Sequence, residues 1–273
     1  MPVTHLHDDL TIHHLGLADP AAPTLVLMHG LTDSGPCWAD AVARWSSSYR
    51  ILAWDARGHG RSARFDGGRL ATGVGETHLA DAVSLLEWLV SSGASAPVLV
   101  GHSMGGGTAA DVAGERPDLV RAVLLEDPAL GRFPEQSPDS AVGARRVAEL
   151  RAIADDPETA LTTCRRDNPR WPPSELEPWL EAKLQTDLAM LADPVVTVRT
   201  PWAEVAEKVA VPALVVTGTD GVIWSGDGLA QLRAVSNPHL EVHVVDGAEH
   251  CVRRTATQAF HALADPWLAA YSS

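Results

Sequence analysis

Six short, mainly apolar runs place the strongest limit on how this chain can fold. Glycine or proline stands near the ends of most of them. A run without polar alternation is typical of a strand that is buried on both faces, and such strands belong to parallel sheets. The runs cover residues 25–28, 51–54, 98–100, 123–125, 214–216 and 240–245.

Helical patterns lie between several of these runs. Apolar residues recur at helical spacing over residues 79–90, and a second helix is expected over residues 104–116, before a proline. A last helix should begin near Thr255, where Pro266 is expected to kink it or divide it in two. A looser alternation over residues 3–14 predicts an antiparallel hairpin. Strands that alternate with helices predict an α/β fold with a mostly parallel, doubly wound sheet.

The alternation stops between residues 131 and 209, where the pattern is helical and rich in proline and tryptophan. We interpret this stretch as a helical lid that is inserted after the sixth strand. Residues 1–130 and 210–273 then form one core domain. Helix starts inside the insertion are predicted at Asp156-Pro157, at the capping-box spacing of Ser174 and Glu177, and at Thr200-Pro201.

Composition and charge exclude several classes of partner. The chain has 35 acidic and 21 basic residues and a formal net charge of −14, which disfavours binding to nucleic acid and to anionic membranes. Its three cysteines form no CxxC pair, which fits a reducing compartment. The sequence contains neither a signal-peptide pattern nor an apolar run of membrane-spanning length. We therefore expect a cytoplasmic protein; its oligomeric state is open, and a homodimer is compatible with the sequence.

The segment Gly101-His102-Ser103-Met104-Gly105 carries the clearest chemical signal. It directly follows an apolar run and leads into a stretch of small residues that is typical of a helix start. A G-x-S-x-G sequence between a strand and a helix predicts a nucleophile elbow, in which a sharp turn exposes the serine hydroxyl at a helix N-terminus. Ser103 is therefore the candidate nucleophile.

A serine hydroxyl needs a general base because it is a weak nucleophile at neutral pH. Among the 12 histidines of the chain, His250 is the best candidate, because it lies in a loop after the last predicted strand and before the final helix. The histidines near the N-terminus have no carboxylate or cysteine partners at metal-ligand spacing, so no metal site is predicted.

These segments resemble the α/β-hydrolase family over nearly the whole chain outside the insertion. His29-Gly30, after the third strand, resembles the oxyanion loop of the family, and residues 55–62 resemble its D-x-R-G-x-G-x-S turn. The resemblance implies an α/β-hydrolase fold, a catalytic triad, a small-molecule substrate and no metal or organic cofactor. It also implies that the backbone N–H groups of Leu31 and Met104 form an oxyanion hole.

The acid of the triad is open at this point. Asp220 follows the seventh strand, where the family most often places its acid, although the loop here is one residue shorter than usual. Glu126, at the end of the sixth strand, is the alternative, because some members of the family carry the acid there. Asp127 would serve if the sixth strand ended one residue later.

Nine tryptophans are many for a chain of this length. Trp171 in the insertion, and Ile223 and Trp224 shortly after Asp220, are candidate substrate-binding residues. They favour a substrate with an apolar or aromatic acyl part. The expected reaction is hydrolysis of a carboxylic ester or lactone through an acyl-enzyme. A carbon–carbon bond hydrolase or a cofactor-free perhydrolase would use the same triad, and a catalytically slow small-molecule receptor is the non-enzymatic alternative.

Overall fold

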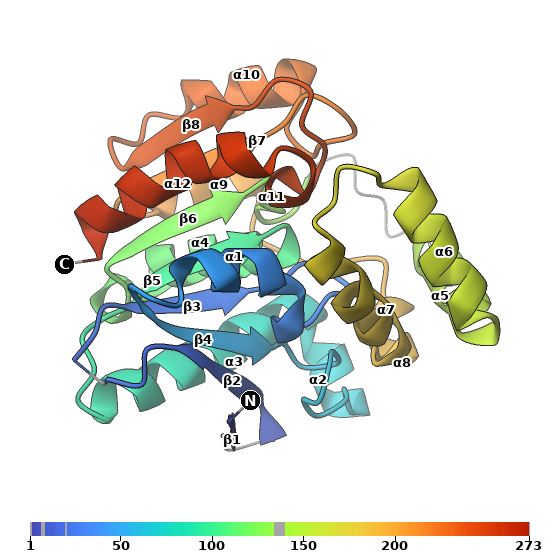
Figure 1. Cartoon of the computed structure of the whole chain (residues 1–273). Helices are drawn as coiled ribbons and strands as arrows, with labels where there is room; N and C mark the ends of the chain where they lie inside the picture. The colour runs from blue at the N-terminus through green and yellow to red at the C-terminus, as the bar shows by residue number, and fades with distance from the viewer. Residues whose placement is uncertain (1, 7–8, 20, 134–139, 273) are drawn as a thin grey trace.

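One mixed sheet forms the centre of the molecule. The structure, a computed structural model, describes residues 2–6, 9–19, 21–133 and 140–272. These residues form an eight-stranded sheet with the strand order β1-β2-β4-β3-β5-β6-β7-β8 (Figure 1). The strands are β1 Val3–His5, β2 Thr11–Gly16, β3 Thr24–Met28, β4 Arg50–Asp55, β5 Val98–His102, β6 Ala122–Glu126, β7 Ala213–Thr217 and β8 Leu240–Val244.

Strand direction agrees with the sequence patterns. Strands β3 to β8 are parallel, and β2 pairs antiparallel with both β1 and β4. Strands β3, β5, β6 and β7 are buried along their whole length, which explains why these runs lack polar alternation. All six predicted runs are strands, and the N-terminal alternation is the predicted hairpin, so the fold class is confirmed.

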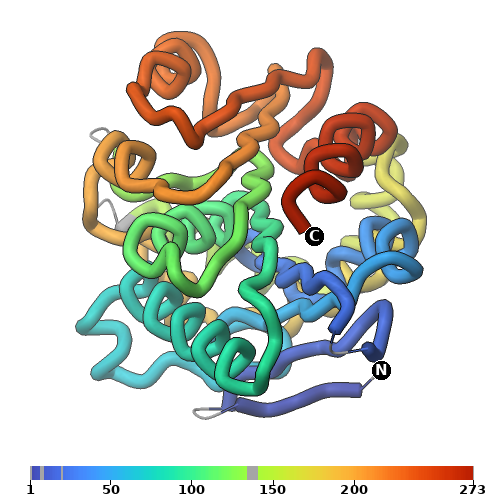
Figure 2. Tube along the Cα trace, turned by 90° about the vertical axis from the view of Figure 1, so that its left-hand side faces the viewer, coloured from blue at the N-terminus to red at the C-terminus, as the bar shows by residue number. Residues whose placement is uncertain are grey.

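Helices cover both faces of the sheet, as Figure 2 shows from the left-hand side of Figure 1. Alternate residues of a strand point to opposite faces, so Leu25 and Leu27 pack in one apolar cluster, and Val26 and Met28 pack in the other. The first cluster lies under α1 Ala39–Trp45, α11 Val252–Thr255 and α12 Thr257–Tyr271. The second lies under α3 Val74–Ser91, α4 Met104–Glu115, α9 Trp202–Lys208 and α10 Gly226–Ala234. Shorter elements are η2 Gly35–Trp38, α2 Gly67–Thr72 and η3 Pro117–Leu119.

The chain between β6 and β7 is helical, as predicted. Helices α5 to α8 lie beyond the carboxyl ends of the parallel strands, toward which the arrowheads of Figure 1 point. Helix α9, although it falls inside the predicted range 131–209, packs against α4 in the layer over the sheet. The segments at the sheet edge are α5 Ser140–Asp155, α6 Pro157–Asp167, η4 Pro173–Glu175, α7 Leu176–Leu184 and α8 Leu188–Leu191.

Two of the predicted helix starts in this segment are confirmed. The Asp156 side chain accepts a hydrogen bond from the Thr159 backbone N–H at 3.1 Å and caps α6, with Pro157 in the first turn. Helix α9 starts directly after Pro201. The capping box at residues 174–177 is wrong, because residues 173–175 form a 3-10 turn and no side chain caps α7.

The C-terminal helix also breaks at a different place from the one expected. Pro266 lies inside the continuous helix α12. The break falls at Ala256, between α11 and α12, where φ of −141° and ψ of 51° leave the helical region. Within the described ranges, no helix combines the length and the apolar character that crossing a membrane requires.

Candidate active site

Ser103 occupies the sharp turn between β5 and α4. Its backbone has a φ of 51° and a ψ of −114°, a conformation that costs a non-glycine residue about 1–3 kcal/mol. The turn packs tightly against β3. This close approach is shown by Gly105, where an added Cβ atom would collide with the carbonyl oxygen of Met28. A Cβ atom at Gly101 would meet the backbone of Gly105 in the same way. Both motif glycines are therefore required for this turn, and the strand–turn–helix geometry expected from G-x-S-x-G is present.

His250 lies in the loop after β8 and contacts Ser103. Its Nε2 atom is 3.0 Å from Oγ of Ser103, and its Nδ1 atom is 2.5 Å from a carboxylate oxygen of Asp127. The carboxylate thus fixes the imidazole in the orientation that leaves Nε2 free to accept the serine proton. The three side chains form one hydrogen-bonded line from carboxylate to hydroxyl.

Asp127 is held in place from several sides. The residue is fully buried, follows β6 directly and has a φ of 37°. Its carboxylate accepts hydrogen bonds from the hydroxyl of Thr217 at 2.7 Å and from the backbone N–H of Ile223 at 2.9 Å. A longer contact of 3.4 Å comes from the backbone N–H of Trp224. Donors converge on both oxygens and fix the orientation of the carboxylate.

The expectation that Asp220 contacts the imidazole is wrong. Its side chain is exposed, and its carboxylate accepts a hydrogen bond from the neighbouring Thr219 hydroxyl at 3.1 Å. Its backbone N–H donates to the carbonyl oxygen of Ala248. The loop after β7 therefore supplies His250 with no carboxylate. It contributes instead the backbone N–H groups that hold Asp127.

The alternative acid, Glu126, is also turned away from His250. Its carboxylate accepts hydrogen bonds from the backbone N–H and the guanidinium of Arg253, both at 2.6 Å. Glu126, the last residue of β6, therefore contacts Arg253, whereas Asp127, directly after the strand, contacts His250. Strand β6 ends at Glu126, one residue beyond the predicted run, and this is the condition under which Asp127 was expected to serve.

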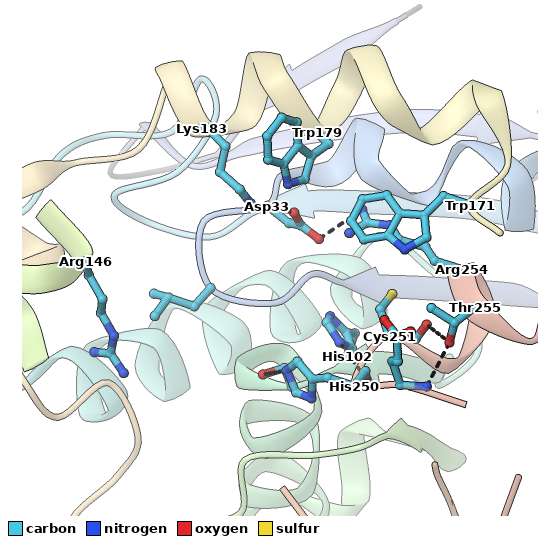
Figure 3. Close-up of a pocket in the computed structure, with 13 residues that line it drawn as sticks. Asp33, His102, Arg146, Trp171, Trp179, Lys183, His250, Cys251, Arg254 and Thr255 are labelled. Carbon is cyan, nitrogen blue, oxygen red and sulfur yellow. Dashed lines mark hydrogen bonds and ion pairs between the residues drawn. The ribbon is translucent and has the colours of Figure 1, made fainter. Parts of the chain in front are cut away.

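A cavity of about 410 Å³ opens over Ser103 and His250 (Figure 3). Helix α7 contributes Trp179 and Lys183 to its upper wall, and the segment before η4 contributes Trp171. Trp171, one of the predicted substrate-binding residues, therefore lies at the cavity. The charged residues of the lining are Asp33, Arg146, Lys183, Glu249 and Arg254.

The other two predicted substrate-binding residues do not line this cavity. Trp224 is fully buried in the core, where its indole N–H donates to the carbonyl oxygen of Pro128 at 2.8 Å. Its ring packs against Phe133 and Trp202. Ile223 packs partly buried against the same core. Both lie close to Asp220 in the sequence, but Trp224 is buried and Ile223 is partly buried against the core, so neither lines the cavity over Ser103 where their predicted role would place them.

Comparison with known proteins agrees with this geometry. A family model described as the alpha/beta hydrolase family matches residues 25–264. The chain belongs to the alpha/beta hydrolase family. The 2-(acetamidomethylene)succinate hydrolase of Mesorhizobium japonicum is 26% identical over 247 residues, which cover 87% of this chain and 85% of that protein.

Solved structures of other hydrolases share the fold of this alpha/beta hydrolase. An enol-lactonase from Burkholderia xenovorans superposes with a TM-score of 0.72 and 23% identity over 98% of this chain and 100% of its own. The naproxen esterase of Bacillus subtilis gives a TM-score of 0.74 and 20% identity over 97% and 90% of the two chains. At these identities the comparison establishes the fold alone.

The two predicted oxyanion-hole residues of this alpha/beta hydrolase, Leu31 and Met104, lie close to Ser103. Met104 begins α4, so its N–H has no acceptor within the helix. Leu31 lines the cavity and follows Gly30, where a Cβ atom would lie 3.3 Å from Cβ of Ser103. The loop after β3 thus runs next to the serine, as an oxyanion hole built from these two groups requires.

A buried ionic network that forms part of the cavity wall was not anticipated from the sequence. Arg254 donates to Glu175 at 2.8 Å and lies 3.1 Å from Asp33, while Arg253 pairs with Glu126. Burial alone raises the pKa of Asp33, but Arg254, Lys183 and Arg253 together hold it well below its ordinary value. The adjacent Arg253 and Arg254, shortly after His250, are the sequence feature that could have indicated this network, since two buried guanidinium groups need carboxylate partners.

The Glu126–Arg253 pair should be important for stability. Replacing Glu126 with glutamine removes the carboxylate closest to the buried Arg253 guanidinium and leaves it the more distant Glu175 at 3.9 Å and Asp33 at 4.0 Å, so the loss should be no more than the value of about 3–5 kcal/mol that breaking a buried pair costs. Urea unfolding followed by tryptophan fluorescence measures the loss. Exchange of Glu241, an exposed carboxylate on β8, for glutamine is the matched control and should change the unfolding free energy by less than about 0.5 kcal/mol.

One group of potential metal ligands occurs in the part of the chain that the structure describes. Ligand atoms of His102, Glu126 and Cys251 lie within 4.8 Å of one another. However, the Arg253 guanidinium contacts both Glu126 and the sulfur of Cys251, the latter at 2.9 Å. Burial also raises the pKa of the Cys251 thiol, which disfavours the thiolate that metal binding needs. A buried cation inside the group makes it a poor site for a metal ion.

Proposed function

We propose that this protein is a serine hydrolase that cleaves a carboxylic ester or lactone through an acyl-enzyme on Ser103. One observation carries the proposal. His250 bridges Ser103 and Asp127 with hydrogen bonds of 3.0 Å and 2.5 Å, and both Ser103 and His250 line a cavity. A hydroxyl, an imidazole and a buried carboxylate in this order are the parts that acyl transfer requires.

The mechanism follows from the positions of these groups. His250 Nε2 takes the proton as Ser103 Oγ attacks the substrate carbonyl, and the oxyanion accepts hydrogen bonds from the N–H groups of Leu31 and Met104. The imidazolium then protonates the leaving alcohol, and the carbonyl re-forms as an ester of Ser103. Water attacks this ester with His250 again as base, releasing the acid and restoring the serine. Asp127 stabilises the imidazolium throughout.

Two alternative reactions would use the same catalytic residues. They differ from ester hydrolysis only in the bond that is cleaved or in the molecule that accepts the acyl group. A carbon–carbon bond hydrolase would cleave a diketone, and a perhydrolase would use peroxide in place of water. The names of the relatives, a succinate-derivative hydrolase, a lactonase and an esterase, favour transfer to water from an acyl donor. The cavity does not favour an apolar acyl part, because Ile223 and Trp224 lie outside its lining and charged residues line it.

A panel of small substrates tests the proposal. An aryl butyrate, a six-membered lactone and a vinylogous diketone should be assayed side by side at equal concentration. We expect catalytic turnover of the ester or the lactone and none of the diketone. Faster cleavage of the diketone would replace the proposal with carbon–carbon hydrolysis. Release of less than one product per chain over hours would favour a receptor.

A further inference from the structure

Arg146 is the cation of the cavity wall that has no carboxylate in an ion pair with it among the described residues. It comes from α5 and is half-buried, yet no salt bridge joins it to a carboxylate of the described residues. Its guanidinium makes one long hydrogen bond, 3.5 Å, to the backbone carbonyl of Asp193. Burial, followed by the nearby Arg145, lowers the pKa of Arg146, although Glu149 and Asp193 oppose this shift. A guanidinium stays charged at neutral pH, so this site holds an incompletely compensated positive charge.

The other two cations of the cavity are already matched. Lys183 lies 3.2 Å from a carboxylate oxygen of Asp33, and Arg254 pairs with Asp33 and Glu175. Glu249, the remaining carboxylate of the lining, pairs with Arg170 outside the cavity. Among the described residues, the cavity lining therefore contains one cation without an ion-pair partner, Arg146.

The location of this charge bears on specificity. Figure 3 shows Arg146 entering from α5 on the opposite side of the pocket from Cys251 and Thr255, with His250 between them. Consider a substrate whose carbonyl carbon reacts with Ser103. The end of this substrate that points away from Thr255 would extend toward Arg146. The whole chain carries a net charge of −14 and repels anions, so a preference for an anionic substrate would have to come from a local cation.

We infer that Arg146 binds a carboxylate of the substrate, and that the protein acts on esters or lactones that carry a free carboxylate away from the reacting carbonyl. The inference rests on the proposed function. An arginine fork matches a carboxylate with two parallel hydrogen bonds, which gives orientation as well as affinity. Charge-assisted hydrogen bonds of this kind correspond to about 10- to 100-fold in binding.

Matched ester pairs test the inference. Mono-p-nitrophenyl adipate and p-nitrophenyl methyl adipate differ only in a free carboxylate, and 4-acetoxybenzoate and methyl 4-acetoxybenzoate place the same difference on the leaving group. We expect wild-type kcat/KM to favour the anionic member of at least one pair, and Arg146→Gln to reduce that ratio about 10- to 100-fold. Arg145→Gln, the exposed neighbour on the same helix, is the control and should leave the ratio unchanged. No preference for either anionic ester, or an equal ratio in Arg146→Gln, overturns the inference.

A binding measurement separates this inference from the proposed function. Calorimetric titration of adipate and of neutral adipamide into the Ser103→Ala protein reports carboxylate binding without turnover. We expect adipate to bind at least about 10-fold more weakly when Arg146→Gln is added, with an intermediate value for Arg146→Lys, which keeps the charge but loses the fork. Equal adipate affinity in all three proteins overturns the inference even if esters are hydrolysed. If no ester is turned over, the proposed function fails, and this titration still decides the role of Arg146.

Discussion

Replacing Ser103 with alanine should lower kcat for any ester that the protein hydrolyses by about a million-fold. The Ser103 hydroxyl is the group that His250 Nε2 contacts at 3.0 Å, and alanine leaves no oxygen at the turn. The turn itself should persist, because its shape depends on the close packing of Gly101 and Gly105. Initial rates with an activated ester measure the loss, and circular dichroism checks that the variant is folded.

Serine removal elsewhere should have no comparable effect. Ser91→Ala, at an exposed position on α3, is the matched control and should retain the full rate. Residual catalysis in Ser103→Ala should remain above the uncatalysed rate, because the oxyanion donors and the cavity still bind substrate. A Ser103→Ala protein with more than a hundredth of the original rate would place the nucleophile elsewhere.

Replacing Asp127 with asparagine should lower kcat by about 10,000-fold while leaving the fold intact. Asparagine keeps the size of the side chain, but its amide would present either an N–H donor or a neutral oxygen to Nδ1 of His250. The imidazole then loses the charge that stabilises its protonated form and the fixed tautomer that frees Nε2. Steady-state kinetics measures the effect.

Two neighbouring carboxylates provide the comparison. Asp220→Asn should change kcat less than about 2-fold, because its side chain is exposed and bonded to Thr219. Glu126→Gln should lose stability rather than chemistry, because its partner is Arg253. A large loss of kcat in folded Asp220→Asn, with little change in Asp127→Asn, would contradict the assignment of the acid.

The sheet and the serine turn were predictable because both depend on local patterns. Continuous apolar runs indicated strands that are buried on both faces. The glycines around Ser103 indicated a turn in which any Cβ atom would collide with the backbone. His250 was also predictable, since its place after the last strand and the need of a serine for a base point to the same residue.

The acid could not be chosen because the choice depends on where β6 ends. A shift of one residue at the end of a strand exchanges the faces to which Glu126 and Asp127 point. Only the register with β5 and β7 settles this, and it places Glu126 beside His102 and Val216. The side chain of Glu126 then meets Arg253, and the carboxylate of Asp127 meets His250.

The polarity of the cavity could not be predicted from the sequence either, because it depends on how distant segments fold together. Trp224 looked like a binding residue from its place in the sequence, yet its loop buries it against Phe133 and Trp202. The cations of the cavity come from α5, α7 and α11, which are far apart in the sequence and meet only in the folded chain. Contacts of this kind leave no periodic pattern that a single sequence can reveal.

The central claim is that Ser103 is a nucleophile activated by His250, and covalent labelling tests it most directly. The protein should be treated with a fluorophosphonate, digested, and examined by mass spectrometry. We expect one adduct per chain, located on Ser103, which forms at least about 1,000-fold more slowly in His250→Ala. An adduct on another serine, no adduct, or equal labelling of His250→Ala would contradict it.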